Sequence, residues 1–157
     1  MVHKLIEGLG NSTKNMLTQK RIITYLMHNH SSTIPDLAKD IDLSIPTVTK
    51  FVMELVEEGY IINYGKQETS EGRPPNLYGL NPDAAYMVGV DIKAFCLNIG
   101  LMNFTGDMVD IQMGIECHLD NTLESLDLLI QHICTFIEKH KNVKEKILQV
   151  GVNISGR

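Results

Sequence analysis

Apolar residues recur at helical spacing in residues 33–58, and the breaks in this pattern predict two short helices joined by a turn. Each helix begins with a hydroxyl residue that is followed two positions later by proline: Thr33 with Pro35, and Ser44 with Pro46. A hydroxyl side chain caps the free N–H groups of a first helical turn, and a proline there loses no hydrogen bond. The segment therefore predicts two successive capped helices.

The second helix has one apolar and one polar face. Its apolar residues lie at i, i+3, i+4, i+7 and i+8, which is one side of a helix. They are Val48, Phe51, Val52, Leu55 and Val56. The opposite face carries short hydroxyls and one cation near the helix start, which suits the major groove of DNA. We therefore predict a recognition helix whose DNA-binding residues are Ser44, Pro46, Thr47, Thr49 and Lys50.

Three further residues bear on whether this pair is a helix-turn-helix. Asp36, three residues after Thr33, predicts a capping box. Ala38 is small, as two helices that cross steeply over a short turn require. Asp42 stands where many such motifs have glycine, and aspartate tolerates turn conformations. The alternative is an ordinary amphipathic helical hairpin within a core.

After the second helix the pattern changes to that of strands. Two β-rich runs, residues 60–64 and 76–80, flank the polar stretch 65–72. Two strands around a polar tip predict the β-wing of a winged helix. We expect Lys66 and Arg73 to contact DNA from this tip, with Arg73 in a narrow minor groove. The alternative is a surface hairpin whose prolines protect an edge strand.

An upstream helix, capped by Ser12 or Thr13, completes the predicted module. Its buried side is expected to be Met16, Leu17, Ile22, Ile23, Leu26 and Met27. Residues 8–35 carry three cations and no acid, although the whole chain has a net charge of −5. Local charge determines where a polyanion binds. The net negative charge of the chain predicts a modest affinity of each subunit for DNA, and hence a dimer on a two-part site.

The pattern changes again at residues 81–85, where we place a domain boundary. The expected domains are 1–82, a winged helix-turn-helix, and 83–157. In the second domain we expect three strands, at 87–93, 95–103 and 106–114. A helix that begins at Asp120 or Asn121 and a last strand at 147–154 are expected to follow. The last strand is almost continuously apolar, which predicts burial on both faces. Glu124 is expected to complete a capping box, and the buried stripe of the helix to be Leu126, Leu129, Ile130, Ile133 and Ile137.

A resemblance to the ROK family (repressors, open reading frames and sugar kinases) is carried by the winged helix, the Gly72-Arg73-Pro74 wing, VGVDIKAFCLNIGLMNFTGDMV and LQVGVNISGR. It covers the chain from about residue 12. The resemblance implies an α+β chain, a winged helix-turn-helix followed by the first part of an actin-like ATPase (ROK) α/β domain. The repressor branch of the family includes xylose- and N-acetylglucosamine-responsive regulators.

The resemblance also implies a function. We expect the N-terminal portion of a longer transcriptional regulator of carbohydrate metabolism, acting as a repressor. It would bind double-stranded operator DNA as a homodimer or higher homo-oligomer. A sugar or sugar-phosphate effector would bind beyond Arg157, where the sugar and zinc sites of the family belong.

One departure from the family concerns ATP. In ROK kinases a Gly-Gly-Thr turn after the first strand's aspartate holds the phosphates through backbone N–H groups. Here Asp91 is followed by Ile92, Lys93, Ala94 and Phe95, whose side chains hinder such an approach. We therefore expect no cofactor in this chain and no enzyme activity. The alternatives are a ROK sugar kinase with an N-terminal extension and a winged-helix module used only for protein interaction.

Other classes of site find little support. Cys96, Cys117 and Cys134 lack the paired spacing of metal ligands and are typical of thiols in a reducing compartment. The apolar runs are too short to span a bilayer, and no signal peptide is recognised. We expect a cytoplasmic protein without a metal site and without a membrane partner.

Overall fold

The two hydroxyl caps predicted from the sequence are present in the computed structural model of the chain. Helix α3 (Ile34–Asp40) begins after Thr33, whose side chain accepts a hydrogen bond from the backbone N–H of Asp36 at 3.3 Å. Helix α4 (Ile45–Glu57) begins after Ser44, which accepts from the backbone N–H of Thr47 at 3.4 Å. Both predicted helix starts are confirmed. The Asp36 carboxylate accepts from the Thr33 hydroxyl at 2.6 Å, so it also stabilises the first turn.

The structure describes residues 14–66, 74–118, 120 and 122–154. The chain divides into two compact units, Met1–Ala84 and Ala85–Arg157. The boundary that we placed between residues 82 and 83 falls within a short 3-10 helix, η1 (Pro82–Ala84), at the end of the first unit.

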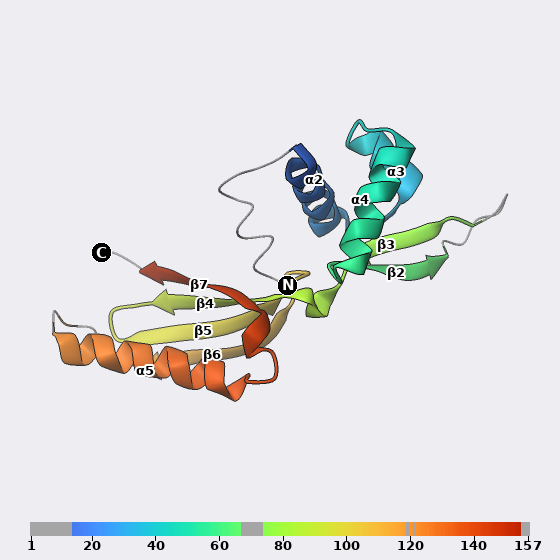
Figure 1. Ribbon diagram of the computed structural model, residues 1–157. Coiled ribbons are helices and arrows are strands. Elements are labelled where there is room, and N and C mark those ends of the chain that lie inside the picture. The colour runs from blue at the N-terminus through green and yellow to red at the C-terminus, as the bar shows by residue number, and fades with distance from the viewer. Residues whose placement is uncertain (1–13, 67–73, 119, 121, 155–157) are drawn as a thin grey trace. The chain divides into compact units, whose positions relative to one another are not determined.

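In its described residues, the first unit has three helices and a three-stranded antiparallel sheet (Figure 1). Besides α3 and α4, its elements are α2 (Lys14–Asn29), β1 (Ser31–Thr33), β2 (Ile61–Lys66) and β3 (Asn76–Leu80). The strand order is β1-β3-β2, so the two wing strands pair with each other and β3 also pairs with β1. This arrangement is that of a winged helix.

The core of the first unit lies between its helices and its sheet. Its fully buried side chains are Ile22, Leu26, Leu37, Val48, Val52, Leu55, Ile61 and Leu80. The prediction that Leu17 and Met27 share the buried side of α2 was wrong, because they are 50% and 46% exposed. Only the side of α2 that carries Ile22, Ile23 and Leu26 is covered by neighbouring elements, which leaves a narrower apolar stripe than expected.

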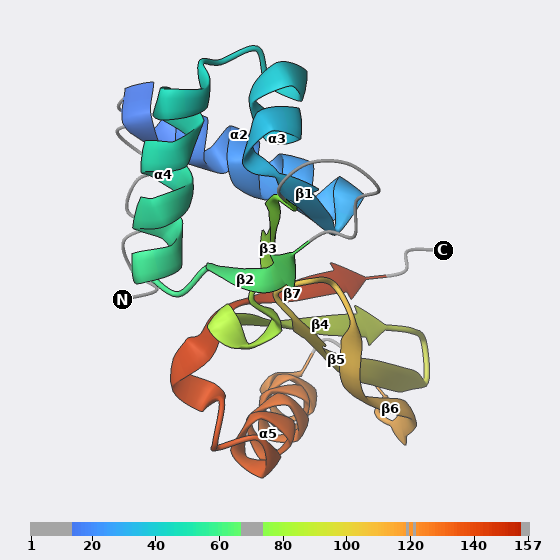
Figure 2. The same cartoon turned by 90° about the vertical axis from the view of Figure 1, so that its right-hand side faces the viewer.

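The part of the second unit that the structure describes is a four-stranded mixed sheet with the helix α5 on one face (Figure 2). Its elements are β4 (Tyr86–Ile92), β5 (Cys96–Asn103), β6 (Met108–Glu116), α5 (Leu123–Lys139), η2 (Lys144–Lys146) and β7 (Ile147–Ile154). The order is β6-β5-β4-β7, with β4 parallel to β7 and the other pairs antiparallel. The predicted succession of three strands, a helix and a strand is confirmed.

For α5, the predicted start was wrong and the predicted buried stripe was right only in part. The helix begins at Leu123 with Thr122 as its cap, because the Asp120 carboxylate accepts from the backbone N–H of Thr122 and so forms a turn before the helix. Ser125 rather than Glu124 therefore donates its backbone N–H to the cap. The buried stripe is confirmed at Leu129, Ile133 and Ile137, which are buried or pack against the core, but Leu126 and Ile130 are 47% and 48% exposed and Phe136 is buried instead.

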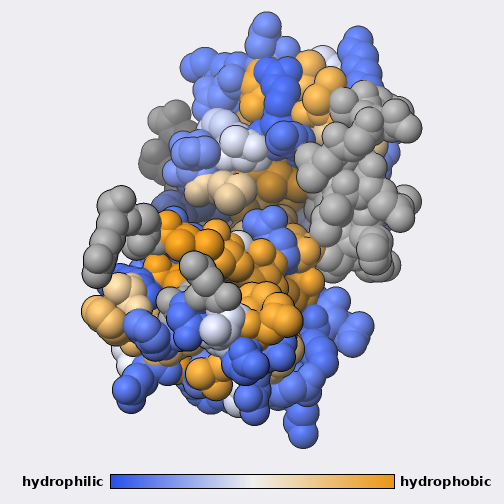
Figure 3. All heavy atoms as spheres, turned by 90° about the vertical axis from the view of Figure 1, so that its left-hand side faces the viewer, coloured by the Kyte–Doolittle hydropathy of each residue, from blue (hydrophilic) through white to orange (hydrophobic). Residues whose placement is uncertain are grey.

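The expectation that β7 is buried on both faces was wrong as well. Val150, Val152 and Ile154 are exposed, Ile154 by 70%. Within the described part of the sheet, β7 pairs only with β4, so one of its edges has no neighbouring strand. Apolar residues accordingly gather on the surface of the second unit, as the orange areas of Figure 3 show.

Candidate nucleic-acid interface

The turn between α3 and α4 has the tight geometry of a helix-turn-helix. Asp42 adopts a left-handed backbone conformation with φ +52°, a region that favours glycine and admits aspartate. The backbone N–H of Leu43 donates to the carbonyl of Ala38 at 3.0 Å, and Ala38 itself is only 3% exposed. The small side chain of Ala38 therefore lies where the chain folds back, as the sequence predicted.

Helix α4 buries one face and presents the other. Val48, Phe51, Val52 and Leu55 are buried in the first unit. On the opposite side Ser44, Pro46 and Lys50 are exposed, and Thr47 and Thr49 are half-buried. The predicted DNA-binding residues of this helix thus lie together on its outward face and at its first turn.

The hydroxyl groups of this surface are held by local hydrogen bonds. The Ser44 and Thr47 hydroxyl oxygens are 2.7 Å apart, and the Thr49 hydroxyl donates to the carbonyl of Ile45 at 2.8 Å. A hydroxyl whose proton is committed still offers lone pairs to a donor. Thr49 is therefore suited to accept a hydrogen bond from a base edge rather than to donate one.

Lys50 belongs to a three-residue network that sequence reasoning missed. Its ammonium lies 3.9 Å from one carboxylate oxygen of Glu54, one helical turn away. The other oxygen of Glu54 accepts from the side-chain amide of Gln19 on α2 at 3.1 Å. The i, i+4 spacing of Lys50 and Glu54 could have indicated the first contact. The second joins residues 35 positions apart and has no local signal.

The two wing strands are anchored at their base. Strand β3 coincides with the predicted run, and β2 pairs with it antiparallel across a register shift between Asn63 and Gly65. Gly65 has φ +99°, and its backbone N–H donates to the side chain of Asn63 at 2.8 Å. The Tyr64 hydroxyl donates to the carbonyl of Leu80 at 2.9 Å. These contacts hold the described parts of the two wing strands together.

The two predicted wing contacts fall in different parts of the hairpin. Lys66 is exposed, but it is the last residue of β2 and pairs with Asn76, so it belongs to the strand end and not to the tip. Strand β2 ends two residues beyond the predicted run, after the register shift. Arg73 lies outside the described residues.

Comparisons with known proteins agree with this geometry. Residues 17–62 match the family of winged helix-turn-helix DNA-binding domains. The xylose repressor of Caldicellulosiruptor bescii is 25% identical over 149 residues, which cover 94% of this chain and 37% of that protein. The xylose repressor of Bacillus subtilis is 25% identical over 142 residues, 89% of this chain and 36% of that protein. The chain thus spans about a third of the length of these relatives.

A solved structure matches most of both units. It is a ROK family transcriptional regulator described as a homologue of the Escherichia coli Mlc protein, with a TM-score of 0.67 and 20% sequence identity. The match covers 88% of this chain and 35% of that chain. The chain has the fold of the N-terminal part of a ROK-family transcriptional regulator. The resemblance stated from the sequence is confirmed, as is the predicted fold class.

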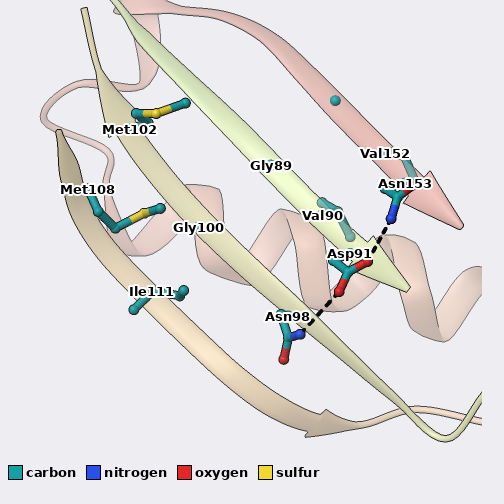
Figure 4. Close-up of a pocket in the computed structure, with 11 residues that line it drawn as sticks. Gly89, Val90, Asp91, Asn98, Gly100, Met102, Met108, Ile111, Val152 and Asn153 are labelled. Carbon is teal, nitrogen blue, oxygen red and sulfur yellow. Dashed lines mark hydrogen bonds between the residues drawn. The ribbon is translucent and has the colours of Figure 1, made fainter. Parts of the chain in front are cut away.

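The ROK fold directs attention to Asp91, at the end of the first strand of the second unit. A hollow of about 500 Å³ lies on the sheet face beside it, with Gly89, Gly100 and Met108 in its lining (Figure 4). The Asp91 carboxylate accepts from the amide of Asn153 at 2.8 Å and from that of Asn98 at 3.4 Å. These two amides hold the carboxylate in place from the neighbouring strands.

In the turn after Asp91, a backbone N–H group of the kind that would bind a phosphate is already hydrogen-bonded within the chain. The backbone N–H of Lys93 donates to the carbonyl of Cys96 at 2.9 Å, which closes the hairpin between β4 and β5. The Lys93 ammonium lies 3.9 Å from the Asp91 carboxylate. Among the described residues, no group of three potential metal ligands lies together.

Proposed function

We propose that this chain is the operator-binding part of a carbohydrate-responsive transcriptional repressor. One observation carries the proposal: a capped recognition helix exposes hydroxyls and a cation beside a β-wing, in a chain with the ROK regulator fold. The relatives named xylose repressor support a repressor and suggest a pentose as the first effector to examine. The effector would bind in a part of the regulator beyond Arg157.

The proposed binding mode follows from the winged helix. Helix α4 enters the major groove, where Ser44, Pro46 and Thr47 at its start and Thr49 and Lys50 in its first turns meet base edges and phosphates. Lys66 and Arg73 extend this contact from the wing to the neighbouring minor groove. We propose a homodimer, because a two-part operator doubles the contacts of a subunit whose net charge is unfavourable.

A sugar kinase is the competing function, and the Asp91 turn argues against it. A phosphate-binding turn needs free backbone N–H groups, whereas that of Lys93 is already used within the hairpin. The side-chain amides of Asn98 and Asn153 also donate hydrogen bonds to the Asp91 carboxylate. This disfavours a role for that carboxylate as a ligand of a phosphate-bound metal ion. We propose that the protein is not an enzyme. Isothermal titration of Mg-ATP into the full-length protein, with and without xylose, tests this proposal. Micromolar binding of Mg-ATP would favour the sugar-kinase function instead.

Operator binding also bears on where the protein works. In the described part of the chain, no helix is long and apolar enough to cross a bilayer. We place the proposed regulator in the cytoplasm because its proposed partner, operator DNA, is there.

The decisive experiment is selection of DNA by this chain. A pool of random-sequence duplexes is incubated with the protein, and the bound fraction is amplified over several rounds. We expect enrichment of one sequence with two related half-sites, whose centres lie roughly 34 Å or a multiple of that apart. The Lys50→Glu variant serves as the control and should enrich the sequence poorly. A wild-type protein that enriches no sequence would refute the proposed function.

A further inference from the structure

A groove on the first unit lies outside the predicted DNA-binding residues. It has a volume of about 920 Å³ and runs between α2 and the turn that precedes α4. We call it the α2 groove, and its defining residues are Lys14, Thr18, Lys20, Arg21, Asp40 and Leu43. Leu43 directly precedes Ser44, the cap of the recognition helix, so the groove is continuous in the chain with the candidate interface.

The α2 groove is basic in a chain that is acidic as a whole. Its lining contains three permanent cations, Lys14, Lys20 and Arg21, against one carboxylate, Asp40. That carboxylate already accepts a hydrogen bond from the Tyr25 hydroxyl at 2.6 Å. Lys14 and Lys20 are exposed and form no ion pair with any acid in the described ranges. The groove therefore offers uncompensated positive charge.

One of the three cations is fixed in position. A guanidinium nitrogen of Arg21 donates to the carbonyl of Ile41, in the turn between α3 and α4. This contact joins α2 to the helix-turn-helix and leaves the other guanidinium N–H groups for a ligand. The hydroxyls of Thr18 and Thr24 line the same groove and add neutral hydrogen-bonding groups.

We propose that the α2 groove binds the sugar-phosphate backbone of DNA next to the half-site that α4 reads. The proposal rests on the proposed function. The cations and hydroxyls of the groove suit phosphates and sugars rather than bases, and the one tyrosine in its lining, Tyr25, already donates its hydroxyl to Asp40. It also explains how a chain with a net charge of −5 approaches a polyanion, because the local field exceeds the effect of net charge.

Contacts of this kind make a specific thermodynamic prediction. Each phosphate neutralised by a cation releases counterions, so the logarithm of the binding constant falls more steeply with the logarithm of salt concentration. Phosphate contacts carry no sequence information, so their loss weakens binding to every duplex alike. Removing Lys14 and Lys20 should therefore change the salt dependence and leave the preference between sequences unchanged.

The test compares two double variants on the selected duplex and on a scrambled one. Lys14→Gln with Lys20→Gln removes two charges from the groove, and Lys141→Gln with Lys146→Gln removes two from the second unit. We measure binding by fluorescence anisotropy from 50 to 300 mM salt, on the order of the physiological range. The groove variant should have a slope shallower by about two units on both duplexes, with the ratio of the two affinities retained. The control variant should keep the wild-type slope.

Several outcomes decide the matter. A groove variant with the wild-type slope overturns the groove proposal and leaves the proposed function intact. A variant that loses the preference for the selected duplex also overturns it, because the lysines would then read bases. Competition by an acidic peptide with no change in slope would assign the groove to a protein partner instead. A wild-type chain that selects no DNA overturns both proposals. Thermal unfolding of each variant confirms that its fold is retained.

Discussion

The side-chain amide of Gln19 donates to the carboxylate of Glu54 at 3.1 Å, and so an acid of the recognition helix is held by a different helix. Glu54 in turn lies 3.9 Å from the ammonium of Lys50. The cation that we assign to DNA contact is therefore partly neutralised in the free protein. We expect this arrangement to lower the affinity of the recognition helix for a polyanion.

Replacing Glu54 by glutamine should strengthen DNA binding. The substitution keeps the size of the side chain and its ability to accept from Gln19, but it removes a negative charge from the DNA-facing helix. We expect affinity to rise by roughly two- to fivefold, since exposed charge pairs contribute modestly. Anisotropy titration of the selected duplex measures this change. Glu57→Gln, one turn further along α4, is the matched control and should have a smaller effect. A lower affinity of Glu54→Gln would mean that the carboxylate accepts a hydrogen bond from a cytosine amino group.

Replacing Lys50 by glutamate should weaken DNA binding without unfolding the first unit. The side chain of Lys50 is 63% exposed and contributes little to the core. The lost phosphate or base contact should make the salt slope shallower by about one unit. Binding measured at several salt concentrations provides the slope, and thermal unfolding provides the control. Equal slopes and affinities for the two proteins would remove Lys50 from the interface.

Replacing Arg73 by alanine tests the wing. Narrow A·T-rich minor grooves concentrate negative potential, and an inserted guanidinium responds to that potential. We expect the variant to lose affinity mainly for operators whose half-sites are flanked by A·T pairs. Titrations of duplexes that differ only in their flanks measure the difference. An equal loss on G·C-flanked duplexes would reduce Arg73 to an ordinary phosphate contact.

Replacing Gly79 by alanine should destabilise the first unit. A Cβ atom there would lie 2.2 Å from the Tyr64 ring and 2.7 Å from the backbone oxygen of His30, and the backbone oxygen cannot simply turn away. We expect a loss of about 1–3 kcal/mol of stability, as for other overpacked sites. Gly89→Ala is the control, because a Cβ atom at Gly89 meets nothing within 4 Å. A melting temperature of Gly79→Ala equal to that of the wild type would contradict the close packing of the wing base.

Local signals account for the parts of the fold that the sequence predicted. The caps Thr33 and Ser44 act within three residues of themselves, so both helix starts could be read from the chain. The turn at Asn103 is equally local, since its side chain accepts from the backbone N–H groups of Thr105 and Asp107. The outward residues of α4 followed from the spacing of its apolar residues.

The errors arose where distant residues decide the outcome. Whether Leu17 or Leu126 is buried depends on which elements cover its helix, and helical periodicity alone does not contain that information. The contact of Gln19 with Glu54 and that of Arg21 with the Ile41 carbonyl likewise join residues far apart in the chain. The charge of the α2 groove was visible in the sequence, but its enclosure by the turn was not.

The pairing of β1 with β3 determines how small a working DNA-binding fragment can be. Ser31 lies opposite Gly79, so the strand before the helix-turn-helix is joined to the last strand of the wing. Asn81 then closes the unit, because its backbone N–H donates to the carbonyl of Tyr60 and its amide to that of Gly59. A fragment cut after α4 or after β2 would leave β1 without a partner and Tyr60 exposed at the base. Residues through Asn81 therefore form the shortest fragment in which α4 keeps its support, and an excised helix-turn-helix should not fold alone.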